Sequence, residues 1–128
     1  MPSWAEYKDT ARLRGSLALE LYVIESTPQA SPEQLKETLP DHLEYQNQLE
    51  AAGNLVLAGP LSDDSGELME GAGLIIYRAA SLDEARALAE ADPMHVRQRR
   101  TYRIRRWLVN EGSLNLQVRL AQQSVVFE

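Results

Sequence analysis

The chain has only two histidines, and the first of them is the residue best suited to acid–base chemistry. At 100° per residue, His42 falls on the same side of an expected helix as Leu39, Gln46 and Leu49. Pro40 suits a first helical position, so the ring is expected in the first turn, where the helix dipole favours a neutral imidazole. Such a ring can accept a proton; the alternative is a structural histidine satisfied within the core.

Asp92 is the second candidate for acid–base chemistry. The pair Asp92-Pro93 is expected to end a helix, because the residue before proline avoids helical backbone angles. A carboxylate near His42 would fix the tautomer of the ring and stabilise its protonated form. We therefore predict that the two side chains lie within direct or one-water reach. The alternative is an aspartate that serves only in a turn.

The second histidine, His95, allows a metal site to be considered. Two histidines and a carboxylate, here His42, His95 and Asp92, form a known ligand set. However, Pro93 interrupts the helix that would place Asp92 and His95 on one face. We therefore expect no metal, and we expect His95 to line a ligand pocket.

Six arginines crowd the window 97–106. On a strand, Arg106 alternates with its neighbours so that it shares a face with Tyr102 and Ile104. There it could bind a carboxylate or phenolate through its planar fork. The alternative is a strand edge guarded by charge, or ion pairs with acidic residues across a subunit contact.

The elements that must position these side chains follow the order βαββαβ. Strands are predicted at 17–24, 55–58, 73–77 and 101–108, the second as a buried run that ends at Gly59-Pro60, whose backbone is expected at the pocket mouth. Helices are predicted after Ser31-Pro32, with a restart at Pro40 favoured over a kink, and after Ser81. This order indicates an α+β, ferredoxin-like fold with an antiparallel sheet and two helices on one face. Its bare second face indicates a homodimer.

The composition is that of one globular domain of 128 residues. We divide it into an N-terminal helix at 1–16, a core at 17–108 and a C-terminal extension at 109–128 that forms a strand or hairpin. The net charge of −6 argues against nucleic acid as a partner, and only one aromatic on the expected central strand argues against RNA. No segment is apolar enough for a membrane span or a secretory signal, so a cytoplasmic protein is expected.

Five features at their observed spacing resemble the YciI-like (YCII-related) family: His42, the Leu57-Ala58-Gly59-Pro60 run, the turn with Gly66, the Ser81–Glu84 helix start and Asp92-Pro93. The resemblance implies a dimeric α/β barrel of ferredoxin-like protomers with a His–Asp pair, which falls on His42 and Asp92. It also implies kinship with muconolactone isomerases and with a branch that removes chloride from a chlorinated hydroxyquinone. The N-terminal helix, the C-terminal extension, the arginine-rich strand and His95 depart from the family pattern.

Together these features predict a lyase or isomerase that needs no cofactor and acts on an aromatic-derived or lactone-like acid. His42 and Asp92 would be catalytic, and Gly59, Pro60, His95 and Arg106 would bind the ligand. The alternative is a non-catalytic protein that holds a small acidic ligand in the same pocket.

Overall fold

A computed structural model describes all residues from Met1 to Glu128. Its central part follows the predicted order: β1 (Leu19–Pro28), α2 (Pro32–Ala52), β2 (Leu55–Pro60), β3 (Gly73–Tyr77), α3 (Leu82–Glu90), α4 (Pro93–Val96) and β4 (Arg100–Val109). Only α4, a single helical turn, was not predicted. The fold is therefore α+β, with the βαββαβ order expected for a ferredoxin-like protomer.

The four strands form one sheet in the order β2-β3-β1-β4. β3 pairs antiparallel with both β1 and β2; Ile24 lies opposite Ile75 and Ala58 lies opposite the same residue. Thr27 near the end of β1 bonds to Thr101 near the start of β4, as in an antiparallel pair. The order confirms the split arrangement, in which the two strands that flank α2 are not neighbours.

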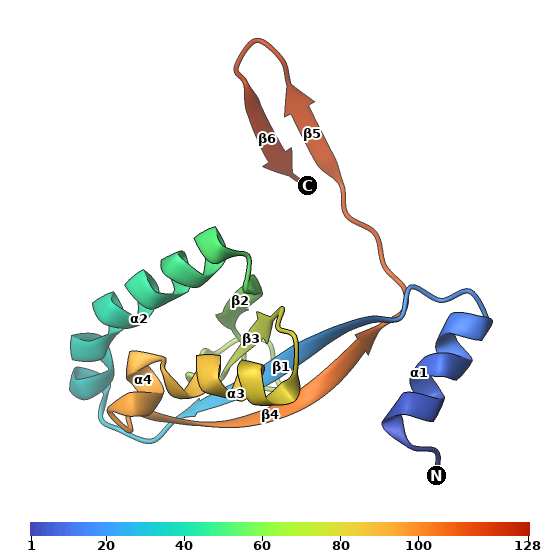
Figure 1. Cartoon of the computed structure of the whole chain (residues 1–128). Coiled ribbons are helices and arrows are strands. Elements are labelled where there is room, and N and C mark those ends of the chain that lie inside the picture. The colour runs from blue at the N-terminus through green and yellow to red at the C-terminus, as the bar shows by residue number, and fades with distance from the viewer. The chain divides into compact units, whose positions relative to one another are not determined.

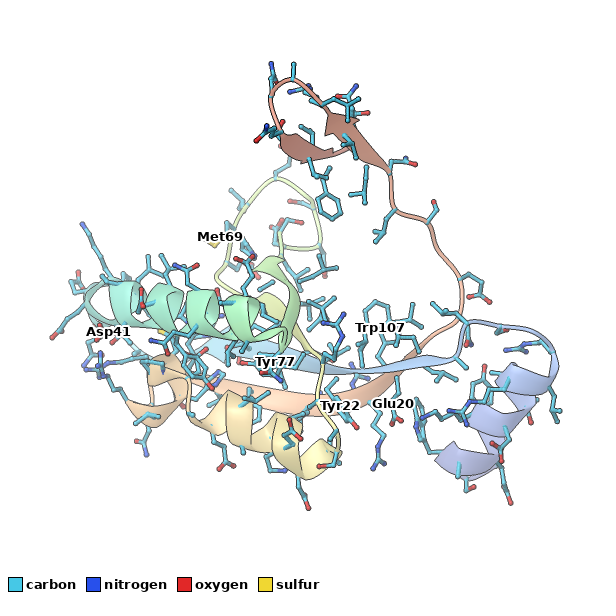
Figure 2. The ribbon with its side chains drawn as sticks, turned by 45° about the horizontal axis from the view of Figure 1, so that its top comes forward. Glu20, Tyr22, Asp41, Met69, Tyr77 and Trp107 are labelled. Atoms are coloured by element: carbon cyan, nitrogen blue, oxygen red, sulfur yellow. The ribbon has the colours of Figure 1, made fainter.

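The helices α2, α3 and α4 all lie on one side of this sheet (Figure 1). Alternate residues of the central strands point toward them and form the core. Tyr22 and Tyr77 belong to this core (Figure 2), together with Ile24, Ile75 and, from the helices, Leu49, Ala85 and Ala89. Because the strand period is two, the same alternation directs Ser26 and Arg100 to the helix side, where the candidate site lies.

The prediction of a helix restart at Pro40 was wrong. α2 runs without interruption through Pro40, starts at Pro32 with a capping box on Ser31, and ends at Gly53 in the left-handed conformation, with φ 85°. His42 is thus in the middle of a long helix, and the argument from the dipole of a first turn does not apply. The packing of the residues of α2 that face the sheet outweighs the backbone hydrogen bond that is lost at Pro40.

The expectation that the second strand is buried on both faces was also wrong. β2 is the edge strand of the sheet, and its last four residues are exposed; Leu57 has a relative exposure of 62 %. An apolar run of this length is compatible with either position, and only the strand order decides between them.

Residues 1–19 and 108–128 form a separate compact unit, distinct from residues 20–107. Its helix α1 (Trp4–Leu13) lies within the predicted N-terminal helix and begins at a capping box on Ser3. Ala11, Ala18 and Leu108 form a small apolar cluster there. The C-terminal extension is an antiparallel hairpin of β5 (Leu116–Arg119) and β6 (Ser124–Phe127), which confirms the predicted added hairpin. No helix has the length and apolar content needed to cross a membrane.

Candidate active site

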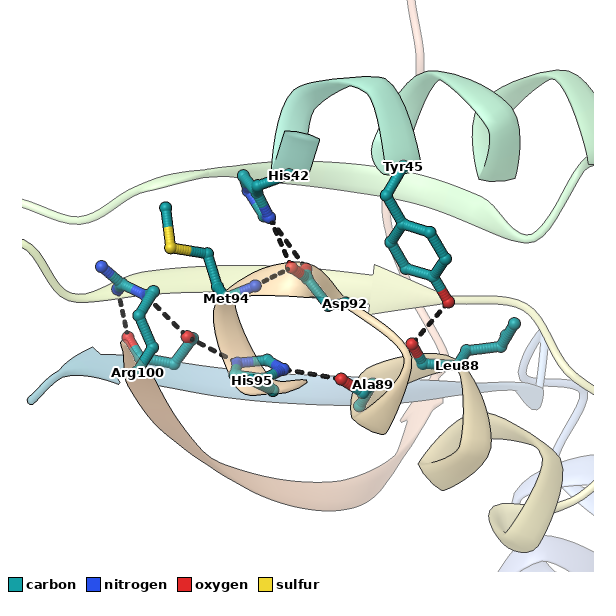
Figure 3. Close-up of polar contacts among 9 residues, drawn as sticks. His42, Tyr45, Leu88, Ala89, Asp92, Met94, His95 and Arg100 are labelled. Atoms are coloured by element: carbon teal, nitrogen blue, oxygen red, sulfur yellow. Dashed lines mark hydrogen bonds and ion pairs between the residues drawn. The ribbon is translucent and has the colours of Figure 1, made fainter. Parts of the chain in front are cut away.

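The two predicted acid–base residues are in direct contact (Figure 3). Nδ1 of His42 lies 2.9 Å from Oδ1 and 2.8 Å from Oδ2 of Asp92. A carboxylate only accepts hydrogen bonds, so Nδ1 of His42 carries a hydrogen and donates a hydrogen bond to Asp92. The expected contact is therefore present in the structure, and the neutral ring is the tautomer with its lone pair on Nε2.

As predicted, a helix ends just before Asp92-Pro93, but Asp92 also begins the next helix. α3 ends at Glu90, and Asp92 has an extended backbone with φ −62° and ψ 126°, which makes it the N-cap of α4. Its Oδ1 accepts the backbone N–H of Met94 at 2.9 Å. Pro93 occupies the first helical position, where a missing N–H costs nothing. The proline thus begins a second helix, and this turn directs the carboxylate at His42.

Asp92 is fully buried, whereas 15 % of the His42 side chain is exposed. The carboxylate therefore has two hydrogen-bond donors, the His42 ring and the Met94 amide, and no contact with solvent. Its charge acts on its surroundings: burial raises the pKa of Tyr45, and Asp92 raises it further. A buried carboxylate in this position fixes the orientation of the imidazole through the Nδ1–H bond.

Nε2 of His42 makes no hydrogen bond within the chain, and the ring lines a cleft of about 560 Å³. This volume is within the range of small-molecule sites. The cleft lies between α2, the ends of β2 and β3, and the loop that joins these strands. Its walls are mainly apolar, with Leu35, Leu39, Leu43, Met69, Ile75 and Met94 among them. Gly59 and Pro60 line it, as expected from the sequence.

His95 also lines the cleft, but both of its ring nitrogens have partners. Nδ1 lies 2.7 Å from the carbonyl oxygen of Ala89, which can only accept, so Nδ1 is protonated. Nε2 then accepts a hydrogen bond from the Ser26 hydroxyl at 3.1 Å. Burial lowers the pKa of His95, consistent with this neutral form. The ring is thus fixed in place and, unlike His42, has no free lone pair on a nitrogen.

Ser26 connects His95 to Arg100. Its hydroxyl accepts a hydrogen bond from Nε of Arg100 at 2.8 Å, and its carbonyl accepts one from Nη2 at 2.9 Å. Nη2 also donates to the carbonyl of Gly71, in the loop between β2 and β3. Gly71 has φ 106°, and a Cβ there would meet Pro28 at 3.1 Å. The glycine therefore allows the loop to pack against Pro28 at the end of β1.

The structure places Arg106 outside this cleft. Its Nε lies 3.2 Å from a carboxylate oxygen of Glu20, and Arg106 lines a different hollow together with Trp107. Arg100, at the other end of β4, is the arginine of this strand that lines the cleft. The sequence analysis missed it, together with the cleft-lining residues Ser26, Lys36 and Met94. The alternation of β4 places Arg100 and Arg106 on one face, and the topology alone determines which end adjoins α2.

The YCII-related domain matches residues 20–108, which is the part of the chain that holds the sheet, the cleft and the His–Asp pair. The chain belongs to the YCII-related family. Among solved structures, this YCII-related protein is similar to the 5-chloro-2-hydroxyhydroquinone dehydrochlorinase of Burkholderia phenoliruptrix AC1100 in complex with 2,5-dihydroxybenzoquinone. The match has a TM-score of 0.56 at 22 % identity and covers 68 % of this chain and 92 % of the other. It shows a shared fold, and a comparison with curated proteins finds no match.

Proposed function

We propose that this YCII-related protein is a lyase or isomerase that acts on a small organic acid in the cleft beside His42. The observation that carries the proposal is the geometry of the pair: Nδ1 of His42 donates to the buried Asp92 carboxylate, while Nε2 has no partner in the chain. A base needs a free lone pair, and a second group must stabilise the cation that forms.

In the proposed reaction, Nε2 of His42 removes a proton from a C–H or O–H bond of the ligand. The bonding pair stays on the ligand and forms a new double bond, while the ring becomes an imidazolium paired with Asp92. In a lyase reaction, a leaving anion such as chloride departs with its own bonding pair. In an isomerase reaction, His42 returns the proton to another atom. Neither route requires an organic cofactor or a metal.

Two lines of support come from the comparisons. The family match includes both members of the pair, and the related fold is that of a dehydrochlorinase whose complex holds a small quinone. A hydroxylated ring of that size suits an apolar cleft of about 560 Å³. We therefore propose chlorinated hydroxyquinols and lactone acids as the first compounds to assay, with chloride release and absorbance change as readouts.

The sharpest variant is His42→Asn. The amide nitrogen of asparagine can replace Nδ1 as a donor to Asp92, but asparagine has no group equivalent to Nε2. We expect turnover to fall at least about a hundredfold, the lower range for loss of a general base, with little change in the free energy of unfolding. Leu49→Ala, a core truncation on the same helix, should instead cost about 2–5 kcal/mol of stability.

Asp92→Asn complements this test. Asparagine is also a good N-cap, so α4 should keep its start, but the side chain no longer carries the charge that stabilises an imidazolium. We expect turnover to fall while the fold persists. Binding of ligands without turnover in the wild-type protein would contradict the enzyme and leave a small-ligand binding protein. Turnover unchanged in His42→Asn would instead contradict the role of His42 as the base.

A further inference from the structure

We propose that Arg100 is the anion-binding group of the cleft, and that the ligand is a small ring compound with a carboxylate, phenolate or enolate oxygen bound at Nη1. This inference rests on the proposed function only in using the same cleft, and it specifies the ligand class. It assigns a role to a residue that the sequence pattern did not single out.

The charge of Arg100 is the first observation in favour of this role. Three of the other five arginines of the 97–106 window have carboxylate partners: Arg97 lies 2.7 Å from Asp41, and Arg105 and Arg106 contact Glu25 and Glu20. Arg100 has none; its three hydrogen bonds go to the neutral oxygens of Ser26 and Gly71. The buried Asp92 charge favours the charged guanidinium through space but forms no ion pair with it. A half-buried guanidinium with no carboxylate in contact gains from the binding of an anion.

The fixed orientation of the Arg100 guanidinium is the second observation in favour of this role. The three bonds use Nε and Nη2 of Arg100, so the guanidinium plane is fixed between β1 and the loop before β3. Nη1 makes no hydrogen bond in the chain, and Figure 3 shows this end of the side chain without a dashed line. Two N–H donors therefore remain in a fixed direction. A pre-oriented arginine loses little entropy when it binds an oxyanion.

The third argument is the composition of the cleft wall. Lys36 adds a second cation, and no aspartate or glutamate is among the residues that line the cleft. The remaining wall is largely apolar, with Leu39 and Leu43 exposed on the side of α2. An apolar ring would pack against these leucines while its charged oxygen lies at the arginine. That arrangement holds the ring in the cleft into which Nε2 of His42 opens.

Ser26 acts as a positioning residue in this arrangement. Its hydroxyl must accept from Arg100, because the proton of the hydroxyl is donated to Nε2 of His95. His95 in turn is held by the carbonyl of Ala89. The donor and acceptor of each hydrogen bond in the series Arg100, Ser26, His95 and Ala89 are thus determined. The series ends on the backbone oxygen of Ala89. The series keeps Nε of Arg100 engaged and leaves Nη1 for a ligand.

The experiment compares matched pairs of charged and neutral probes: 2,5-dihydroxybenzoquinone with 2,5-dimethoxybenzoquinone, and benzoate with benzamide. Affinities are measured by calorimetry on the full chain. We expect the wild-type protein to prefer the anion of at least one pair by about tenfold or more, as for a charge-assisted bond. Arg100→Gln should abolish this preference. Arg106→Gln, which removes an equal charge from the same strand, should retain it.

Equal affinity for anion and neutral probe in the wild-type protein, no binding of either anion, or an unchanged preference in Arg100→Gln would overturn the inference. If Arg100→Gln does not fold, Ser26→Ala supplies the test. This variant keeps the charge but loosens Nε, so the preference for the anion should fall severalfold; a purely structural Arg100 would change melting temperature alone. Anion binding through Arg100 without turnover would contradict the proposed function and leave this inference intact.

Discussion

A fully buried carboxylate with two neutral donors is the feature that gives the site its chemistry. Asp92 accepts hydrogen bonds from His42 and from the Met94 amide, and no arginine or lysine forms an ion pair with it. When His42 takes up a proton, the pair becomes an ion pair, and at about 4 Å such charges attract by roughly 4 kcal/mol before desolvation. The N-terminus of the short helix α4 lies at Asp92, and its partial positive charge opposes the imidazolium by less, about 0.3–1 kcal/mol. The carboxylate therefore dominates the electrostatics of the histidine.

The ring nitrogens of the two histidines have different hydrogen-bond partners. His42 has a free Nε2, whereas both nitrogens of His95 are engaged, by Ala89 and Ser26. The sequence analysis predicted His42 as the base and His95 as a residue of the pocket wall, but it could not predict that Ala89 and Ser26 engage both nitrogens of His95. The sequence analysis also predicted Arg106, and not Arg100, as the ligand-binding arginine. The two residues are six positions apart on one strand, so they share a face of the sheet but lie about 20 Å apart. The free nitrogen of His42 and the place of Arg100 in the cleft depend on hydrogen-bond partners from distant segments, and only the fold brings these segments together.

His95 predicts a pH dependence of stability. Burial lowers its pKa below the ordinary value of 6.5, so the unfolded chain binds this proton more readily than the folded chain. The contribution of His95 to stability is complete above about pH 6.5 and is lost as the pH falls through the lowered value. Denaturant unfolding at a series of pH values should show this loss.

The matched variant is His95→Asn, whose amide nitrogen can keep the hydrogen bond to Ala89 but does not titrate. We expect the acid-side decline in the free energy of unfolding to become shallower in this variant. An identical decline in both proteins would show that His95 does not contribute to it.

The helix α2 brings His42 and much of the apolar wall to the cleft. The capping signal of Ser31 allowed its start to be predicted, but Pro40 in its interior was misread as a second start. The short helix α4 escaped prediction because four residues have no periodicity, and Asp92-Pro93 signals both the end of one helix and the start of another. Capping residues act locally and can be recognised in the sequence. Whether a helix continues through a proline depends on its packing against the rest of the fold.

Pro40 lacks the N–H that would bond to the carbonyl of Lys36, which itself lines the cleft. Pro40→Ala should restore this bond and raise the free energy of unfolding by about 1–3 kcal/mol. It should lower turnover, because Lys36 and Leu39 move relative to His42 when the helix becomes regular. Urea unfolding and a turnover assay measure both effects. Pro32→Ala, at the first helical position, should change neither; a loss of stability in Pro40→Ala would contradict this account.

At the scale of the whole molecule, one face of the sheet in residues 20–107 carries no helix. Val23 and Ile76 line a hollow on that face with Trp107, which is 44 % exposed. The sheet order followed from the order of elements in the sequence, whereas that order does not determine what covers this face. We propose a homodimer that buries it. Light scattering should give twice the mass of the 14.4 kDa chain.

Val23→Asp places a charge on this face and should shift the protein toward the monomer. Gln48→Asp makes the same change on an exposed part of α2 and should leave the dimer intact. A wild-type monomer at micromolar concentration would contradict the proposed dimer.

The most direct test of the central claim is the tautomer of His42, measured by nitrogen NMR on protein with isotope-labelled histidine. The chain has only two histidines, and His95→Asn assigns the signals. At a pH of about 8, where imidazole is ordinarily neutral, the account predicts a proton on Nδ1, bonded to Asp92, and a bare lone pair on Nε2. Adding 2,5-dihydroxybenzoquinone should shift the Nε2 signal. A neutral His42 with its proton on Nε2 would contradict the account, because the nitrogen that opens to the cleft could not then act as the base.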